Sequence, residues 1–204
     1  RQGFEENDVF YHPDLAFRFS VPGQWTVQNQ PRQVALIEPN QSAYMIFSFA
    51  DANTPEAAAQ NLAGQDGLSV LERRATTVNG YDARRVLAEG QTQQGQTVRL
   101  LAYFIAYNGN VYQFQGLTTA QRYGTYRGTF EQSMTSFNRL TDSRILNVEP
   151  TRIAIRPANR QASFASFINT GALPDGMTEL DLAIINQLDL NETVPSTRPL
   201  KLPN

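Results

Sequence analysis

The sequence of 204 residues contains no cysteine and a single histidine, His12. Without cysteine the chain cannot form disulfides, thiolate zinc sites or iron–sulfur clusters, and it has no thiol nucleophile. One histidine cannot supply the His-Glu-x-x-His pair of a hydrolytic zinc site. His12 is also the one candidate base for a serine hydrolase, and no Gly-x-Ser-x-Gly motif accompanies it. The sequence therefore predicts no catalytic residue, metal or cofactor in this chain.

Clustered positive charge and long apolar runs are lacking as well. The formal net charge is -2, with 17 basic and 19 acidic residues. Because binding to a polyanion needs a clustered excess of cations, nucleic acid is excluded as a partner. No apolar stretch approaches the roughly 20 residues that cross a bilayer, so we expect no membrane span. Glu179 and Asp181 lie where a helix begins, and the helix dipole explains them better than glycosidase chemistry does.

The composition is otherwise that of a globular protein, with 41% hydrophobic and 18% charged residues. The length fits one large domain, or a medium domain followed by a small one. The character of the sequence changes past residue 147. We therefore expect an α+β domain at residues 1–147 and a small domain at residues 148–204.

Short runs that alternate apolar and polar residues predict strands over most of residues 1–147. One hairpin is expected where Pro22-Gly23 separates residues 17–21 from residues 25–27. A second is expected at Asn79-Gly80, because Asn-Gly between extended runs is the strongest short-range hairpin signal. We expect the strands to be antiparallel. Further strands are predicted at residues 34–37, 44–49, 69–73, 75–78, 81–88, 97–107 and 111–117.

Two helices are predicted beside this sheet. Thr54 before Pro55 is typical of a helix start, and Gly64 is expected to end that helix. The second ends near Ser136, because apolar residues recur there at intervals of three or four and should pack on the sheet. Residues 141–147 are expected to form a connector. The predicted fold class is α+β, an antiparallel sheet flanked by helices.

The tail predicts a small β-α-α-β unit. A short strand is expected at residues 152–155 and a closing strand at residues 200–202. Short helices are expected at residues 163–168 and 179–187.

Residues 12–22, HPDLAFRFSVP, followed by Trp25, resemble the HPDLGFxFxVPxxW opening found downstream of the catalytic domain in some bacterial M48-family zinc metalloproteases. The rest of that module looks like residues 79–83, 103–107, 111–116 and 136–137. The layout is also similar to the PsbP and Mog1 class of folds, which implies an α/β/α sandwich but transfers no function.

The tail resembles a degenerate LysM module. Its strands would be residues 153–157 and 199–203, and its helices residues 163–167 and the segment ending at residues 184–186. It departs from the family at Ala158-Asn159-Arg160-Gln161, where Gly-Asp-Thr is usual. Those residues shape a glycan-contacting loop in LysM proteins, so peptidoglycan binding by the tail is one open alternative.

The protease resemblance implies that zinc and the His-Glu-x-x-His helix belong to a domain upstream of this chain. The chain itself would then contribute contacts with a protein substrate or envelope partner, localisation, or shielding of an active site. The expected location is periplasmic or secreted, with a lipid anchor on a preceding part as one option. The open alternative is a free-standing periplasmic protein-binding module or a peptidoglycan-associated lipoprotein.

An interaction surface, if the chain has one, is expected on the loops of both predicted domains. Each candidate taken singly is more often a turn or packing residue, since aromatic rings on strands bury a large apolar area. The candidate binding residues are Tyr11, His12, Trp25, Asn108, Asn110, Asn159 and Leu188.

Overall fold

A computed structural model describes residues 3–146, 153–173 and 177–203 of the chain. The chain divides into two compact units, residues 1–147 and 148–204. Within the described residues, no helix is long and apolar enough to cross a membrane.

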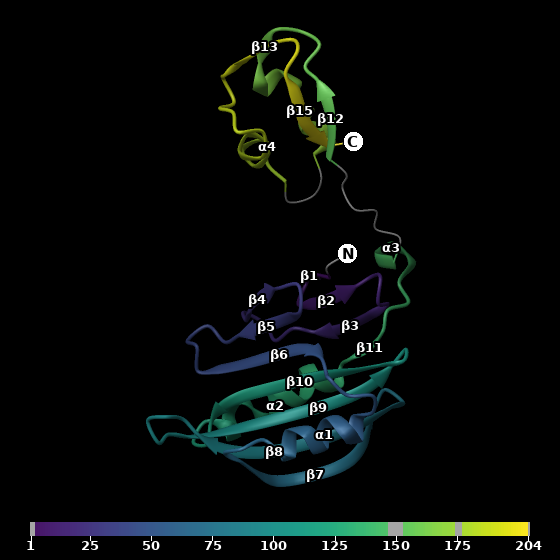
Figure 1. Cartoon of the computed structure of the whole chain (residues 1–204), viewed down its shortest axis with the longest axis vertical. Helices are drawn as coiled ribbons and strands as arrows, with labels where there is room; N and C mark the ends of the chain where they lie inside the picture. The colour runs from purple at the N-terminus through teal and green to yellow at the C-terminus, as the bar shows by residue number, and fades with distance from the viewer. Residues whose placement is uncertain (1–2, 147–152, 174–176, 204) are drawn as a thin grey trace. The chain divides into compact units, whose positions relative to one another are not determined.

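A seven-stranded antiparallel sheet forms the centre of the first unit (Figure 1). Its order is β4-β5-β6-β10-β9-β8-β7. The turns at Asn79-Gly80 and Asn108-Gly109 have positive φ at both positions, as the tight turns that match strand twist require. The predicted antiparallel strands are confirmed. Their bounds are β4 (Thr26–Asn29), β5 (Gln33–Ile37), β6 (Ala43–Phe49), β7 (Leu68–Val78), β8 (Tyr81–Gln91), β9 (Thr97–Tyr107) and β10 (Asn110–Thr119).

A separate four-stranded sheet, in the order β1-β2-β3-β11, was not predicted. The expected hairpin between residues 17–21 and 25–27 is wrong, because β3 pairs with β2 and β11 whereas β4 pairs with β5. The chain changes sheets at this point, and the Trp25 ring packs edge-on against Tyr126 and Phe130. The strands are β1 (Phe4–Glu6), β2 (Val9–His12), β3 (Phe17–Ser20) and β11 (Asn138–Arg139).

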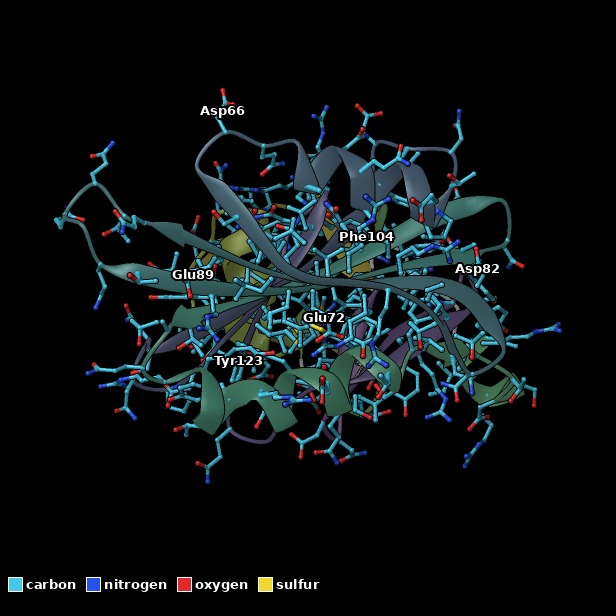
Figure 2. All side chains as sticks on the ribbon, turned by 90° about the horizontal axis from the view of Figure 1, so that it is seen from below. Asp66, Glu72, Asp82, Glu89, Phe104 and Tyr123 are labelled. Atoms are coloured by element: carbon cyan, nitrogen blue, oxygen red, sulfur yellow. The ribbon has the colours of Figure 1, made fainter. Side chains whose placement is uncertain are left out.

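Helices α1 (Pro55–Ala63) and α2 (Tyr123–Thr135) cover opposite faces of the large sheet, as Figure 2 shows. The Thr54 hydroxyl accepts the Ala57 N–H at 3.1 Å and caps α1 as predicted. On the α2 face, a Cβ at Gly116 would lie 2.8 Å from the Phe130 ring, so only glycine allows this close approach. The predicted helix-flanked antiparallel sheet is confirmed, with the four-stranded sheet as an addition on the α2 side.

The core of the first unit lies on both faces of the large sheet. One cluster joins Phe19 of the small sheet to Phe114 of the large sheet and Phe130 of α2. The other packs Leu62 of α1 against Phe104 of β9. Downstream of β11, α3 (Ser143–Leu146) occupies most of the expected connector, and Asn147 lies outside the described residues.

The second unit pairs its first and last strands, β12 with β15, in antiparallel register. Thr178 and Asp181 form a reciprocal capping box at the start of α4. The expected helix at residues 163–168 is a 3-10 helix, and Arg152 lies outside the described residues. The elements are β12 (Ile153–Pro157), β13 (Ala162–Ser163), η1 (Phe164–Phe167), η2 (Thr170–Ala172), α4 (Glu179–Asn186), β14 (Thr193–Val194) and β15 (Pro199–Pro203).

Candidate functional site

A pocket of about 110 Å³ opens between the two sheets of the first unit. We name it the intersheet pocket. Its walls come from β2 and β3, from the hairpin at residues 29–34 between β4 and β5, and from the adjoining ends of β6 and β10. Because the site draws on both sheets, its residues are far apart in the sequence.

Aromatic rings form the apolar part of the pocket. Tyr112 stacks on Phe47 with ring centroids 5.7 Å apart and meets the edge of Phe17 at 5.2 Å. Phe49, whose ring centroid is 4.9 Å from that of Tyr112, is 50% exposed. A half-exposed phenylalanine at the mouth of an aromatic pocket is a feature typical of binding surfaces.

The hydroxyl of Tyr112 is buried and makes no hydrogen bond among the described residues. Burial raises the pKa of Tyr112 to about 12. The Asn110 amide lies close enough to offset this pKa rise slightly, but the two groups lack hydrogen-bonding geometry. A buried hydroxyl without a hydrogen-bond partner lowers the free energy of unfolding by about 1–3 kcal/mol. The Tyr112 hydroxyl therefore destabilises the folded state of the first unit.

His12 forms part of the opposite wall. The candidate residues were expected on loops, but His12 is the last residue of β2, and the turn begins after it. Its Nδ1 accepts the Leu15 N–H at 3.2 Å, which places the proton of the neutral ring on Nε2. Burial lowers the pKa of His12, and the nearby Asp14 carboxylate offsets part of that effect. His12 is therefore a neutral hydrogen-bond donor at pH 7.

The β4–β5 hairpin supplies a polar rim. The Gln30 N–H donates to the Gln33 carbonyl at 2.9 Å and closes a turn with Pro31 and Arg32 at its tip. The Asn29 amide donates to the Gly3 carbonyl at 2.5 Å. These bonds, with the fixed φ of proline, hold the rim in one conformation.

The structure brings only part of the predicted candidate set to this pocket. His12 lines it, whereas Asn110 lies near the Tyr112 hydroxyl but does not line the pocket. The Tyr11 ring packs at a tilt against that of Phe4, with 5.7 Å between the ring centroids, and Trp25 packs on α2. Both of these aromatic residues serve packing, and Asn108 occupies the left-handed position of the β9–β10 turn.

The two candidates in the second unit, Asn159 and Leu188, both have structural roles. Asn159 has a φ of 57° and donates its N–H to the Ser196 carbonyl at 2.9 Å, so it is a turn residue. Leu188 is 7% exposed and belongs to the hydrophobic core of the unit. It also borders a cavity of about 360 Å³ together with the exposed Leu180 and Ile184.

Arg32, Phe49 and Tyr112, on which the binding properties of the intersheet pocket depend, were not among the candidates predicted from the sequence. Phe47 and Phe49 point to the same face of β6, because alternate residues of a strand share a face. That alternation was a signal, but it does not reveal that Phe49 lies where its face is left open. Arg32 follows Pro31 and carried no signal beyond a turn.

The described residues show no grouping of three or more His, Cys, Asp or Glu side chains that could hold a metal ion. Ser48 reaches the pocket, but its hydroxyl accepts the Gln113 amide at 2.9 Å on the other face of β6. It is therefore not presented to His12 as a nucleophile.

No protein-family model matches the sequence, and no curated protein matches it. Among solved structures, the chain is similar to cyanobacterial PsbP (CyanoP) from Synechocystis sp. PCC 6803, with a TM-score of 0.47, 13% identity, and 68% of this chain and 91% of that chain covered. It is similar to LpqN of Mycobacterium tuberculosis, a protein involved in cell envelope biogenesis, with a TM-score of 0.43, 14% identity, and coverage of 61% and 83%. It is also similar to PA94, a protein of unknown function from Pseudomonas aeruginosa. The TM-score is 0.42 and the identity 16%, with 66% of this chain and 93% of that chain covered. These likenesses are loose, so the proposals below rest on the geometry and sequence of the chain itself.

Proposed function

We propose that the first unit is a non-catalytic binding module whose intersheet pocket takes one apolar side chain of a polypeptide partner. The observation that carries this proposal is the half-exposed Phe49 at the mouth of an aromatic pocket of about 110 Å³. An apolar cavity of about 150 Å³ holds one benzene molecule, so this pocket matches a single side chain rather than a larger molecule.

The polar rim favours a polypeptide as the source of that side chain. Asn29, Gln30 and Gln33 carry amides that both donate and accept hydrogen bonds, as a peptide backbone requires. Nucleophilic catalysis needs a nucleophile beside a base that a third group orients. Among the lining residues, His12 has neither a carboxylate partner nor a free nucleophile. The proposed role is therefore recognition alone.

Titration of the full chain with N-acetylphenylalaninamide tests the pocket, with N-acetylglycinamide as the control ligand. We expect saturable NMR shift changes at the backbone amides of Leu15, Val34 and Phe49 with the first ligand alone. Phe49→Ala should weaken this binding. Tyr44→Ala is the matched control, because Tyr44 is 39% exposed on the opposite face of the same strand. Absence of saturable shifts, or equal effects of both variants, would refute the proposal.

We further propose that this module is an accessory region of an envelope or secreted zinc metallopeptidase, with zinc held in an upstream domain. The motif at residues 12–22, followed by Trp25, supports this proposal. The natural gene provides the test: its reading frame should continue upstream through a His-Glu-x-x-His motif. A signal peptide directly before Arg1 would rule out this parentage and favour the free-standing periplasmic module instead.

The free-standing module is the alternative, and it predicts a protein partner in envelope extract that survives washing at several salt concentrations. For the second unit we propose a separate function, the binding of peptidoglycan by a LysM-like module. The pairing of its first and last strands, β12 and β15, with α4 between them in the sequence supports this proposal. Residues 148–204 should then sediment with purified peptidoglycan. Failure to sediment would remove wall binding without affecting the proposal for the first unit.

A further inference from the structure

We infer that the polypeptide segment taken by the intersheet pocket carries a carboxylate next to its apolar side chain, and that Arg32 pairs with that carboxylate. This inference rests on the proposed binding function of the pocket. It names the chemical class of the partner segment, which is an apolar residue flanked by Asp or Glu.

The charge of the pocket is one-sided. Among the described residues that line it, Arg32 carries a positive charge and no side chain is a carboxylate. Asp14 acts on His12 through space but does not line the pocket. A lysine next to the bound side chain would therefore meet only like charge, whereas a carboxylate would meet an arginine.

Arg32 also differs from most arginines of the first unit. Within the described part of the chain its guanidinium makes no ion pair, although the unit is rich in such pairs. The paired arginines and their partners are Arg73 with Glu56, Arg74 with Glu72, Arg84 with Glu56 and Asp82, Arg85 with Glu72 and Glu131, Arg99 with Glu89, Arg127 with Glu131, and Arg144 with Asp142. The Arg32 guanidinium is thus available to an external carboxylate, which its planar fork can bind through two donors.

The backbone beneath Arg32 is held in place. Pro31 precedes it, and the turn is closed by the Gln30 N–H to Gln33 carbonyl bond at 2.9 Å and by a Gln33–Gln30 side-chain bond at 3.3 Å. A fixed turn reduces the entropy lost when Arg32 pairs. On the opposite wall, the Nε2–H of His12 is a second donor suited to an acceptor rather than to a cation.

Three probe peptides test the inference with the full chain: Ac-Gly-Ser-Phe-Glu-Ser-Gly-NH2, and the same peptide with Gln or Lys in place of Glu. We expect the Glu peptide to bind tightest and the Lys peptide weakest, in steps of about two- to fivefold, since the pair is exposed to solvent. The same order should hold when the variable residue precedes Phe. The differences should shrink in about 0.5 M NaCl, because salt screens exposed charges.

Charge reversal supplies the decisive control. Arg32→Glu should invert the preference, so that the Lys peptide binds tightest. Arg18→Glu should leave the order unchanged, because Arg18 is an exposed arginine of β3 that does not line the pocket. Equal affinity of the Glu, Gln and Lys peptides for the unmodified chain overturns the inference and leaves the pocket proposal standing. Absence of saturable binding for every peptide overturns the pocket proposal itself.

Discussion

His12 is half-buried in the pocket wall, where desolvation lowers its pKa below the usual value of 6.5. Below pH 6.5 the unfolded chain therefore binds a proton at this residue more readily than the folded chain does. The associated stability is present above pH 6.5 and is lost as the pH falls from 6.5 through the lowered folded-state pKa. His12 is the one histidine of the sequence, so this titration stands apart from those of the carboxylates.

We expect His12→Gln to flatten the pH dependence of the free energy of unfolding between about pH 7.5 and 5.5. Urea denaturation at several pH values measures this pH dependence for the unmodified chain and for the His12→Gln variant. Parallel curves for the two proteins over this range would show that the His12 pKa is not lowered by folding. His12→Gln also reports on binding, because a glutamine keeps a hydrogen-bond donor at this position without a titrating ring.

Tyr107 and Tyr112 form a matched pair of buried tyrosines. The Tyr107 hydroxyl donates to the Ala16 carbonyl at 2.6 Å, whereas the Tyr112 hydroxyl has no partner among the described residues. Tyr107→Phe should therefore lower the free energy of unfolding by about 1 kcal/mol, while Tyr112→Phe should leave it unchanged or raise it by a similar amount. Urea denaturation distinguishes the two. A loss in Tyr112→Phe equal to that in Tyr107→Phe would mean that the Tyr112 hydroxyl is satisfied.

At the scale of elements, Arg85 links β8 to α2 and β7. Its side chain is 2% exposed and lies 2.8 Å from Glu131 and 3.1 Å from Glu72. Burial alone would lower the pKa of Arg85, but its bond to Glu131 and the field of Glu72 raise the pKa. The guanidinium Nε and Nη1 still lack hydrogen bonds within the described structure. The buried Arg85 charge therefore needs Glu131 and Glu72 to compensate it. The two carboxylates need Arg85 less, because water reaches both of them.

This asymmetry predicts an order of stabilities. Glu131→Gln leaves a buried arginine short of charge compensation and should cost about 2–4 kcal/mol in the free energy of unfolding. Arg85→Met fills the space with apolar atoms and should cost less, because the released Glu131 and Glu72 are partly solvated. Arg127→Met is the surface control and should cost at most about 0.5 kcal/mol. If Arg85→Met is the most damaging of the three in chemical denaturation, the argument from burial is wrong.

Local signals were enough to predict most elements of the large sheet. Asn79-Gly80 marked its hairpin because both residues tolerate positive φ, and Thr54 marked the start of α1 because its hydroxyl accepts the Ala57 N–H. The four-stranded sheet was missed because its strands are short and β1 ends in Glu5-Glu6, which obscures the apolar alternation. The β3–β4 error has the same origin, since the sequence shows a turn but not which sheet each strand joins.

The candidate site was less predictable than the elements. His12 was predicted as a candidate because it belongs to a recognisable motif, whereas Phe49 and Tyr112 have the pattern of ordinary core residues of strands. Their role depends on the gap between two sheets, which is a tertiary feature absent from local patterns. Trp25 was predicted as a candidate binding residue, and in the structure its partly buried ring packs edge-on against Phe130 of α2, because burial of a large ring is favourable.

At the scale of the whole molecule, each unit has its own hydrophobic core. Phe114 belongs to the main cluster of the first unit, and Leu182 belongs to a cluster drawn wholly from the second. A unit of only about 60 residues buries a smaller share of its surface than a larger one and is correspondingly marginal. We therefore expect the full chain to unfold in two thermal transitions, with the second unit melting first.

Core substitutions assign the two transitions. Leu182→Ala should lower the first transition alone and Phe114→Ala the later one alone, with losses of about 2–5 and 3–5 kcal/mol respectively, because each leaves a cavity in a fully buried position. Differential scanning calorimetry of the full chain provides the measurement. If Leu182→Ala shifts both transitions together, the chain is one cooperative unit. The pocket proposal would then have to be tested with the second unit intact, since its loss would destabilise the sheets that form the pocket.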